Sequence, residues 1–406
     1  MTLTIQTLKR RKNYIIALSV LMYCVGMSST DIYISLLPKM IAEFQDTAGL
    51  VNITISIYNL GIAISVLCIG EISERYGRKN VLLAGIIVFS ISAALIAFTS
   101  SLGIIICLRF VQAVACSTII VVPRLIFKDF MDIKEFAAAN ALLLMGLVLA
   151  TSFAPILGAY VGKYYSWRAC FILSSMIGVV AAIACSIILV ESNINKLQRF
   201  ASLPVYLNKY WNVFRNTQFL TITMIYAMNI GAYFTFIGLA SYLYIVDWKI
   251  TAEIFSLIYA LMSLAYFMGN ITMQYLIKRD YSVDSIILLG VKATLFAIAI
   301  LILTLIIPLH SLQIIFLTLS ITIIRFASAL IAPSTQVLLL KCFDQNNPSI
   351  ALGLNMFMGF AIGSFSVYIG SFFINYAFYG IIFLTIAFSS LSVLVALLRP
   401  ISRFRL

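Results

Sequence analysis

Long apolar runs separated by short polar segments repeat along the whole chain. Each run can cross about 30 Å of hydrocarbon, which takes about 20 helical residues. Helices are expected because a backbone in lipid finds no water to bond, and the alternation typical of a β-barrel does not occur. The pattern predicts twelve spans, over residues 13–37, 51–70, 81–99, 102–125, 137–162, 169–190, 218–245, 253–277, 284–307, 312–339, 349–374 and 377–398.

The composition excludes a water-soluble globular protein. Of the 406 residues, 63% are hydrophobic and only 10% are charged, and the mean hydropathy is +1.08. A soluble domain carries about 25% charged residues. We therefore predict an all-α integral membrane protein. A cleaved signal peptide is not expected, because the first run is long and further spans follow it.

Lysine and arginine residues are distributed unequally between the two sides of this topology. With the N-terminus in the cytoplasm, nineteen lie in cytoplasmic segments, and only Lys39, Lys163, Arg168 and Lys249 lie in external ones. The positive-inside rule then places both termini in the cytoplasm. The net charge of +13 reflects this orientation. Nucleic-acid binding is not expected, because the basic residues form no continuous stripe.

One polar, basic connection, residues 191–217, is longer than the others. It is expected to act as a cytoplasmic linker, with an amphipathic surface helix, between two six-span halves at residues 1–190 and 218–406. The tripeptide "LRF" at 108–110 in span four is echoed by "IRF" at 324–326 in span ten. Weak self-similarity of this kind is typical of transporters built from repeated halves.

Metal-dependent or enzymatic chemistry is not indicated. The chain has seven cysteines without a C-x-x-C pair and a single histidine, His310. The cysteines are interpreted as small apolar residues inside helices. No H-E-x-x-H motif and no convincing nucleophile–base pair occurs, so we expect no cofactor and no enzymatic activity.

The cytoplasmic turn between spans two and three carries the sequence "GEISERYGRKNVLL", residues 70–83. Gly70 and Gly77 are expected to allow close packing and a tight turn. The basic residues suit helix-end carbonyls and anionic headgroups, and the acid supplies an opposite charge. These charged residues are Glu74, Arg75, Arg78 and Lys79.

This turn resembles the G-x-L-a-D-R-x-G-R-K signature of the major facilitator superfamily, with Ile72 and Glu74 in place of the usual Leu and Asp. "LRFVQAVACS", residues 108–117, is similar to the family's span-four signature and keeps Arg109 and Gln112. "YYSWRACF", residues 164–171, looks like its W-R-x-x-F motif at the start of span six. The resemblance implies two six-helix bundles, and it implies a gating role for the turn.

Two further stretches resemble drug–proton antiporters of this family. "ATSFAPILGAYVG", residues 150–162, is similar to the antiporter signature G-x-x-x-G-P-x-x-G-G. "TDIYISLLPKM", residues 30–40, resembles a motif of the twelve-span Bcr/CflA branch. The resemblance implies proton-coupled efflux of drugs or of a secreted metabolite such as a siderophore. The alternative is a proton symporter that imports a nutrient. Pro155 and Gly158 match the antiporter signature, and Ala150, Ala154 and Ala159 replace glycines.

Asp31 is an acid inside the first predicted span, roughly 27 Å from the inner face at 1.5 Å per residue. A charge costs about 3 kcal/mol at mid-helix and less near an interface. Three interpretations compete: a helix-end group among the lipid headgroups, a static partner of Arg109, or a proton-loading site. Arg109 lies in the same outer half of the membrane, so the second and third interpretations overlap.

Candidate cavity residues are polar or aromatic and recur at helical spacing in span seven, with core packing as the alternative. Because no second acid lies in mid-span, neutral, zwitterionic or monocationic substrates are favoured. Arg325 either adds positive charge to the second half or packs against backbone carbonyls. The candidates are Tyr58, Asn59, Gln112, Tyr226, Asn229, Tyr233, Phe236, Tyr259, Tyr266, Asn270, Asn355 and Met358.

The expected partners are a small-molecule substrate, protons and the lipid bilayer. The short extramembrane segments are typical of a multi-pass protein of the bacterial inner membrane. We expect it to act as a monomer.

Overall fold

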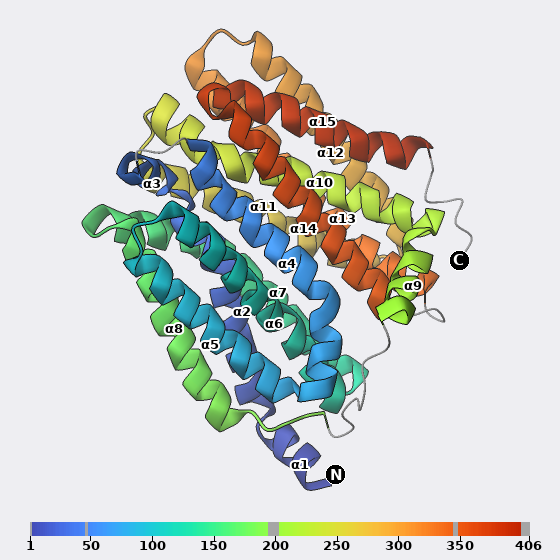
Figure 1. Cartoon of the computed structure of the whole chain (residues 1–406). Helices are drawn as coiled ribbons and strands as arrows, with labels where there is room; N and C mark the ends of the chain where they lie inside the picture. Colours follow the sequence, from blue (N-terminus) through green and yellow to red (C-terminus); the bar gives the residue numbers. More distant parts are fainter. Residues whose placement is uncertain (1, 45–47, 194–202, 344–347, 399–406) are drawn as a thin grey trace. The chain divides into compact units, whose positions relative to one another are not determined.

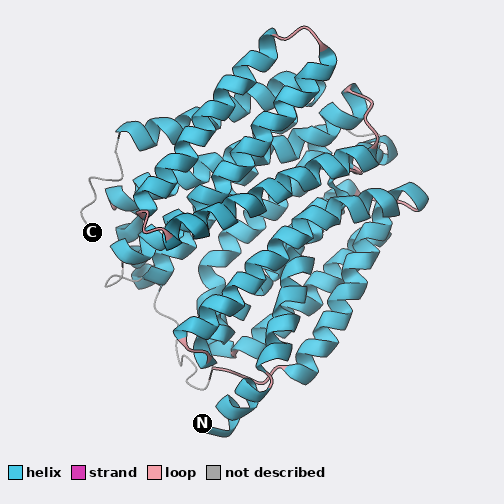
Figure 2. Ribbon diagram, turned by 180° about the vertical axis from the view of Figure 1, so that it is seen from behind, coloured by secondary structure: helices cyan, strands magenta, loops and turns pink. Residues whose placement is uncertain are grey.

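The computed structural model describes residues 2–44, 48–193, 203–343 and 348–398, and these are almost entirely helical (Figures 1 and 2). No strand occurs within these ranges. Eleven helical stretches of the described chain are long and apolar enough to cross a membrane. The all-α membrane class predicted from the apolar runs is confirmed.

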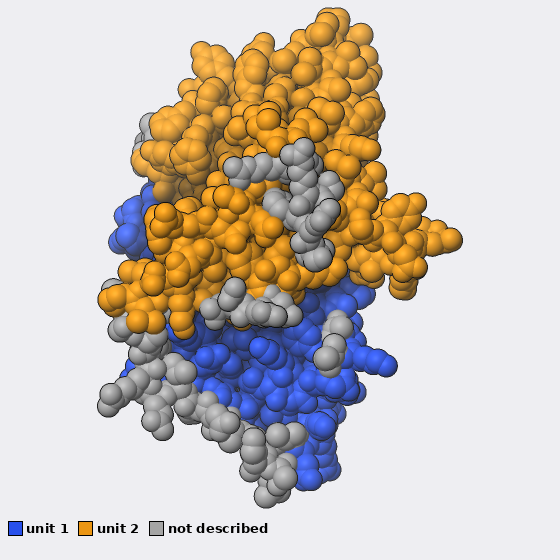
Figure 3. All heavy atoms as spheres, turned by 90° about the vertical axis from the view of Figure 1, so that its right-hand side faces the viewer, with its two compact units in different colours: residues 1–46, 57–202 blue, residues 47–56, 203–406 orange. Residues whose placement is uncertain are grey.

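The chain forms two compact units (Figure 3). Unit 1 comprises residues 1–46 and 57–202, and unit 2 comprises residues 47–56 and 203–406. Helix α4 (Ala48–Tyr76) begins in unit 2 and continues in unit 1. The other helices of unit 1 are α1 (Thr2–Arg10), α2 (Lys12–Ile34), α3 (Leu37–Phe44), α5 (Arg78–Phe98), α6 (Leu102–Phe130), α7 (Ile133–Tyr164) and α8 (Trp167–Ile188).

Unit 2 contains α-helices, a π-helical turn and a 3₁₀ turn. They are α9 (Leu203–Phe214), α10 (Thr217–Ser241), η1 (Tyr242–Asp247), α11 (Ala252–Lys278), α12 (Val283–Ile306), α13 (His310–Cys342), α14 (Pro348–Gly370), η2 (Ser371–Tyr376) and α15 (Ala377–Leu398). Helix α9 lies in the predicted linker, and residues 194–202 of that linker are outside the described chain.

The eleven stretches differ from the predicted twelve at the end of the chain. The last stretch, Ser349–Leu398, is 50 residues long and holds both α14 and α15. The two helices are joined by η2 rather than by a polar loop. Helical backbone therefore continues through the boundary that was predicted between residues 374 and 377.

Corresponding helices pair within each unit. Helix α2 packs along α7 in unit 1, and α10 packs along α14 in unit 2. Both pairs approach closely at glycines, because a missing side chain leaves room for the facing backbone or side chain. A Cβ on Gly359 of α14 would lie 2.5 Å from the ring of Tyr226 on α10. The repeated pairing agrees with the internal similarity of the two "RF" motifs.

Candidate functional site

Arg109 of α6 is the centre of a buried polar cluster in unit 1. Its exposed fraction is 0%. The Nη1 atom donates to the carbonyl oxygen of Ser29 (3.3 Å), to Ser29 Oγ (3.1 Å) and to Gln112 Oε1 (2.8 Å). The Nη2 atom donates to Thr30 Oγ1 (3.1 Å). Helix α2 therefore supplies oxygen acceptors to the guanidinium, and α6 supplies one more a turn away.

Aromatic rings complete the surroundings of Arg109. Its guanidinium carbon lies 4.0 Å from the ring centroid of Tyr58, 4.9 Å from that of Tyr33 and 5.8 Å from that of Phe171. A cation over such a ring gains about 0.5–2 kcal/mol. Because a buried charge must be compensated, the rings and the hydrogen bonds together explain why an arginine is retained here.

Asp31 lies on α2 directly after Thr30, in the last turn of that helix, and only 6% of it is exposed. A carboxylate among lipid headgroups would be solvated, so the burial opposes the headgroup interpretation. Ser29 and Thr30, the two residues before Asp31, both accept hydrogen bonds from Arg109. The structure thus brings α2 and α6 together at the two charged residues singled out in the sequence.

Small residues of α7 hold that helix tightly against α2. A Cβ on Gly158 would overlap the carbonyl oxygen of Ile32, the residue that follows Asp31. One turn later, Lys39 Nζ donates to the carbonyl oxygen of Gly162 at 2.6 Å. The antiporter-like stretch therefore fixes the backbone that carries Asp31. The small or buried residues of α7 here are Gly146, Ala150, Ala154, Pro155, Gly158, Ala159 and Gly162.

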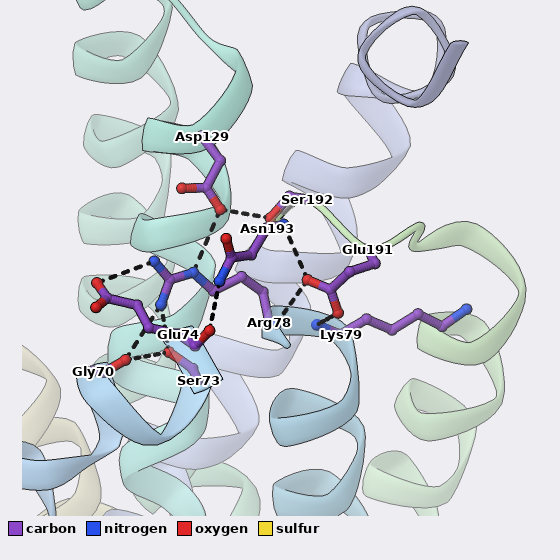
Figure 4. A network of polar contacts seen from close by, with 9 residues as sticks. All are labelled: Gly70, Ser73, Glu74, Arg78, Lys79, Asp129, Glu191, Ser192 and Asn193. Atoms are coloured by element: carbon purple, nitrogen blue, oxygen red, sulfur yellow. Dashed lines mark hydrogen bonds and ion pairs between the residues drawn. The ribbon is translucent and has the colours of Figure 1, made fainter. Parts of the chain in front are cut away.

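The turn between α4 and α5 is formed by Gly77, whose φ of 101° favours glycine. This confirms the tight turn predicted there. The next residue, Arg78, is buried and its side chain points back to the end of α4 (Figure 4). Its Nη1 atom donates to the carbonyl of Gly70 (3.3 Å) and to Ser73 Oγ (2.6 Å). Its Nη2 atom lies 3.4 Å from Glu74 Oε1.

Acidic and polar residues from distant segments join this turn (Figure 4). Asp129, at the end of α6, accepts from Arg78 Nε (3.4 Å) and from Ser192 Oγ (2.7 Å). Asn193 donates to the carbonyl of Glu74 at 2.7 Å. Sequence reasoning missed these partners. The available signal was the scarcity of acids, since only 14 occur in the chain and Asp129 is on the predicted cytoplasmic side.

Glu191 binds the beginning of α5. Its two carboxylate oxygens accept from the backbone N–H groups of Arg78 (2.8 Å) and Lys79 (3.2 Å). The first N–H groups of a helix have no partner within it, and the positive end of the helix dipole favours an anion. The segment after α8 is thereby attached to the turn.

One expectation for this turn is wrong. Gly70 lies inside α4, and apart from the neighbouring backbone of that helix no described atom falls within 4 Å of the position that its Cβ would occupy. Gly70 takes part in the contacts of Arg78 through its backbone carbonyl oxygen, and any residue at this position has that group. Of the other basic residues, Arg75 stacks 5.5 Å from the ring centroid of Tyr76, and Lys79 Nζ donates to the carbonyl of Ser186 at 2.9 Å.

The predicted face of α10 points into unit 2. Asn229 is 1% exposed, and its amide is bonded to the protein: Nδ2 donates to Thr294 Oγ1 (3.3 Å), and Oδ1 accepts from Ser328 Oγ (2.6 Å). Tyr226 meets Gly359, and Tyr233 lies against Arg325. Asn229 thus links α10 to α12 and α13, and its place in a substrate cavity stays a prediction.

Three other predicted cavity residues carry buried amide atoms without a partner in the described chain. They are Asn59 (Nδ2), Gln112 (Nε2) and Asn355 (both Nδ2 and Oδ1). Buried polar groups are normally hydrogen-bonded, since leaving one unpaired costs about 1–3 kcal/mol. These atoms are therefore available to a bound molecule or to water.

Residues 18–248, more than half of the chain, match the sequence model of the Major Facilitator Superfamily. An "uncharacterized transporter" of Rickettsia bellii (strain RML369-C) is 28% identical over 270 residues, 66% of this chain and 66% of that protein. "Multidrug resistance protein D" of Escherichia coli (strain K12) is 30% identical over 166 residues, 41% of this chain and 42% of that protein.

The "bicyclomycin resistance protein homolog" of Haemophilus influenzae is 23% identical over 215 residues, 53% of this chain and 54% of that protein. The matched regions therefore span less than two thirds of the relatives' own length. Among solved structures, a point mutant of the nucleoside transporter NupG has a TM-score of 0.71 at 16% identity, covering 96% of this chain and 98% of that one. A D-xylose–proton symporter has a TM-score of 0.68 at 13% identity, covering 95% and 96%. At such identities the likeness concerns the fold.

Proposed function

The chain belongs to the major facilitator superfamily of membrane transporters, and on this premise we propose that it is a proton-coupled antiporter. It exports small apolar or amphipathic compounds, drugs or a secreted metabolite such as a siderophore, by alternating access. Relatives named for multidrug and bicyclomycin resistance support export. The proposal also places the chain in the bacterial inner membrane as a monomer.

The observation that carries the proton-coupling proposal is the position of Asp31. It is buried next to two residues that bind the guanidinium of Arg109. In the proposed cycle, protons from outside neutralise Asp31, and the neutral form crosses the conformational change more easily than the charged form. Release of the proton to the cytoplasm restores the carboxylate, and the charged state favours capture of substrate from inside.

The proposed topology has twelve spans and both termini in the cytoplasm. The fifty residues of the last helical stretch measure roughly 75 Å at 1.5 Å per residue, more than twice the thickness of the hydrocarbon. Two crossings joined at η2 fit this length. The domains are then residues 1–190 and 218–406, with residues 191–217 as the cytoplasmic linker. The 70–83 turn acts as the conformational gate of the first bundle.

The decisive test compares Asp31→Asn with the unchanged protein. Asparagine keeps the size and polarity of the side chain but cannot ionise, so proton-coupled efflux is expected to be lost while the protein stays folded. Everted vesicles with an acidic interior and a pH-sensitive dye report proton exit when bicyclomycin is added. Glu43→Gln, which removes an acid outside the cluster, is the matched control and should retain coupling. Retained coupling in Asp31→Asn contradicts the proposal.

The alternative function is a proton symporter that imports a nutrient, and the D-xylose–proton symporter illustrates that this fold serves import as well. The same vesicles separate the two. An antiporter moves protons against the direction of the substrate, whereas a symporter moves both in the same direction.

A further inference from the structure

The two units contain matching arginines with matching aromatic neighbours. Arg109 of α6 lies between Tyr58 and Tyr33 in unit 1. Arg325 of α13 lies in unit 2 between Tyr233 and Tyr266, with its guanidinium carbon 4.0 Å and 4.2 Å from their ring centroids. The two arginines occupy the same place in the "LRF" and "IRF" motifs. Each half of the transporter thus holds one cation between two tyrosine rings.

The hydrogen bonding of the two arginines differs. Arg109 donates to acceptors on Ser29, Thr30 and Gln112. Arg325 is 8% exposed, its Nε atom is buried, and that atom has no acceptor in the described part of the chain. Within the same ranges, no carboxylate forms an ion pair with Arg325 either. Arg325 therefore carries a charge that the tyrosine rings balance only in part.

A hydrogen-bonded chain of polar side chains includes Ser328, which follows Arg325 on α13. Ser328, almost one turn along α13, donates to Asn229, and Asn229 donates to Thr294. Ser328, Asn229 and Thr294 thus bond to one another, whereas Arg325 Nε has no acceptor in the described chain. The hydrogen bonds among Ser328, Asn229 and Thr294 connect α13 with α10 and α12. Arg325 on α13 is therefore held beside the rings of Tyr233 and Tyr266.

An arginine remains charged at every physiological pH, and its planar fork matches a carboxylate. A bound molecule can supply the acceptor that Arg325 lacks in the described chain, and the neighbouring rings favour a flat aromatic one. We propose that Arg325 receives an acidic group of the substrate, so that aromatic carboxylates, as anions or within zwitterions, are among the exported compounds. This proposal rests on the proposed export function and names a substrate class for it.

The first experiment needs only the unchanged protein. Naphthoate and naphthamide share one ring system and differ in charge, so their dissociation constants on purified protein isolate the acidic group. Naphthoate is expected to bind about tenfold more tightly or better, the gain expected from one charge-assisted contact. Equal affinity for the two probes overturns the proposal.

Variants then assign the preference to Arg325. Arg325→Gln is expected to weaken naphthoate binding about tenfold, to the level of naphthamide, and to leave naphthamide binding unchanged. Lys292→Gln removes an exposed positive charge from α12 of the same unit and should change neither constant. Tyr266→Leu, which keeps the charge but removes a flanking ring, should weaken naphthoate binding about threefold or more. If Arg325→Gln binds naphthoate as tightly as the unchanged protein, the assignment is contradicted. If Arg325→Gln does not fold, unchanged naphthoate binding by folded Tyr266→Leu contradicts it instead.

Transport separates this proposal from the function on which it rests. If Arg325→Gln still exports bicyclomycin against protons but loses naphthoate export, both proposals are supported. If the unchanged protein exports bicyclomycin without any preference for naphthoate over naphthamide, the acidic-group proposal fails and the exporter stands. If the unchanged protein exports none of these compounds, the proposed export function fails. The dissociation constants for naphthoate and naphthamide still test whether Arg325 binds an acidic group.

Discussion

At the scale of single residues, replacing two glycines by alanine should have opposite effects on the stability of the protein. A Cβ on Gly158 overlaps the carbonyl oxygen of Ile32, whereas a Cβ on Gly70 meets no described atom within 4 Å other than its own helix backbone. Gly158→Ala should therefore push α7 away from α2 and destabilise the protein by about 1–3 kcal/mol. Gly70→Ala should be neutral or stabilising by up to about 1 kcal/mol, because alanine favours a helix interior.

Thermal unfolding of both purified variants measures this difference, and the proposed proton-coupled efflux, assayed as above, measures its effect on transport. Because Ile32 follows Asp31, Gly158→Ala should also reduce transport. An unfolding temperature of Gly158→Ala equal to that of Gly70→Ala would show that α7 and α2 do not depend on the close approach.

Some residues of the candidate site could be singled out from the sequence, and others could not. Asp31 and Arg109 were predicted because a charge inside an apolar run is costly and therefore conspicuous. Their neighbours were not predictable, because Ser29 and Thr30 are ordinary residues in a helix and become acceptors only when α6 packs beside α2. Asn229 was assigned to a substrate cavity for its polarity, but spacing along one helix does not reveal that Ser328 and Thr294 take up its amide.

At the scale of elements, the attachment of Glu191 to α5 is testable. Glu191→Ala leaves the N–H groups of Arg78 and Lys79 without their carboxylate, at a cost of about 0.5–2 kcal/mol. Hydrogen exchange at these two amides should accelerate. Ser192→Ala, which removes only the contact with Asp129, should leave their exchange unchanged. Equal protection in both variants would show that Glu191 does not hold the start of α5.

A second contact between helices should make the stability of the fold depend on pH. Glu43 of α3 accepts from Trp167 Nε1 at 2.6 Å and pairs with Arg168 at the start of α8. Burial alone would raise the pKa of Glu43, but the hydrogen bonds from Arg168 and Trp167 and the charge of Arg168 together lower it below its ordinary value of 4.5. The ion pair therefore stabilises the fold above that value, and its contribution is lost as the pH falls through the lowered pKa.

The unfolding temperatures of the unchanged protein and Glu43→Gln check this sign. Their difference should be constant from neutral pH down to about 5 and should shrink below about 4.5. Because both side chains are partly exposed, the contribution at neutral pH should be about 1 kcal/mol or less. A difference that grows on acidification would contradict the direction of the shift.

At the scale of the whole molecule, the membrane class and the family followed from patterns that need no tertiary contacts. Apolar length predicted the helices, and the motifs at 70–83 and 30–40 predicted the family that the comparison found. The last boundary was less well predicted, because η2 continues the helical backbone with the apolar residues Phe372, Phe373 and Ile374. A polar loop marks a membrane surface in a sequence, whereas a 3₁₀ turn of aromatic residues does not.

The number of crossings at this turn decides on which side the chain ends. If α14 and α15 cross separately, η2 lies outside and the end of α15 lies in the cytoplasm, on the same side as the turn between α11 and α12. Single cysteines, in a variant without the seven native ones, test this at exposed positions: Phe372→Cys, Leu398→Cys and Tyr281→Cys. A membrane-impermeant maleimide should label the first from outside in intact spheroplasts and the other two only in everted vesicles. Labelling of Leu398→Cys and Tyr281→Cys from opposite sides would mean that residues 349–398 cross once. That result would leave an odd number of spans, and the two halves could then not be six-helix repeats with both termini in the cytoplasm.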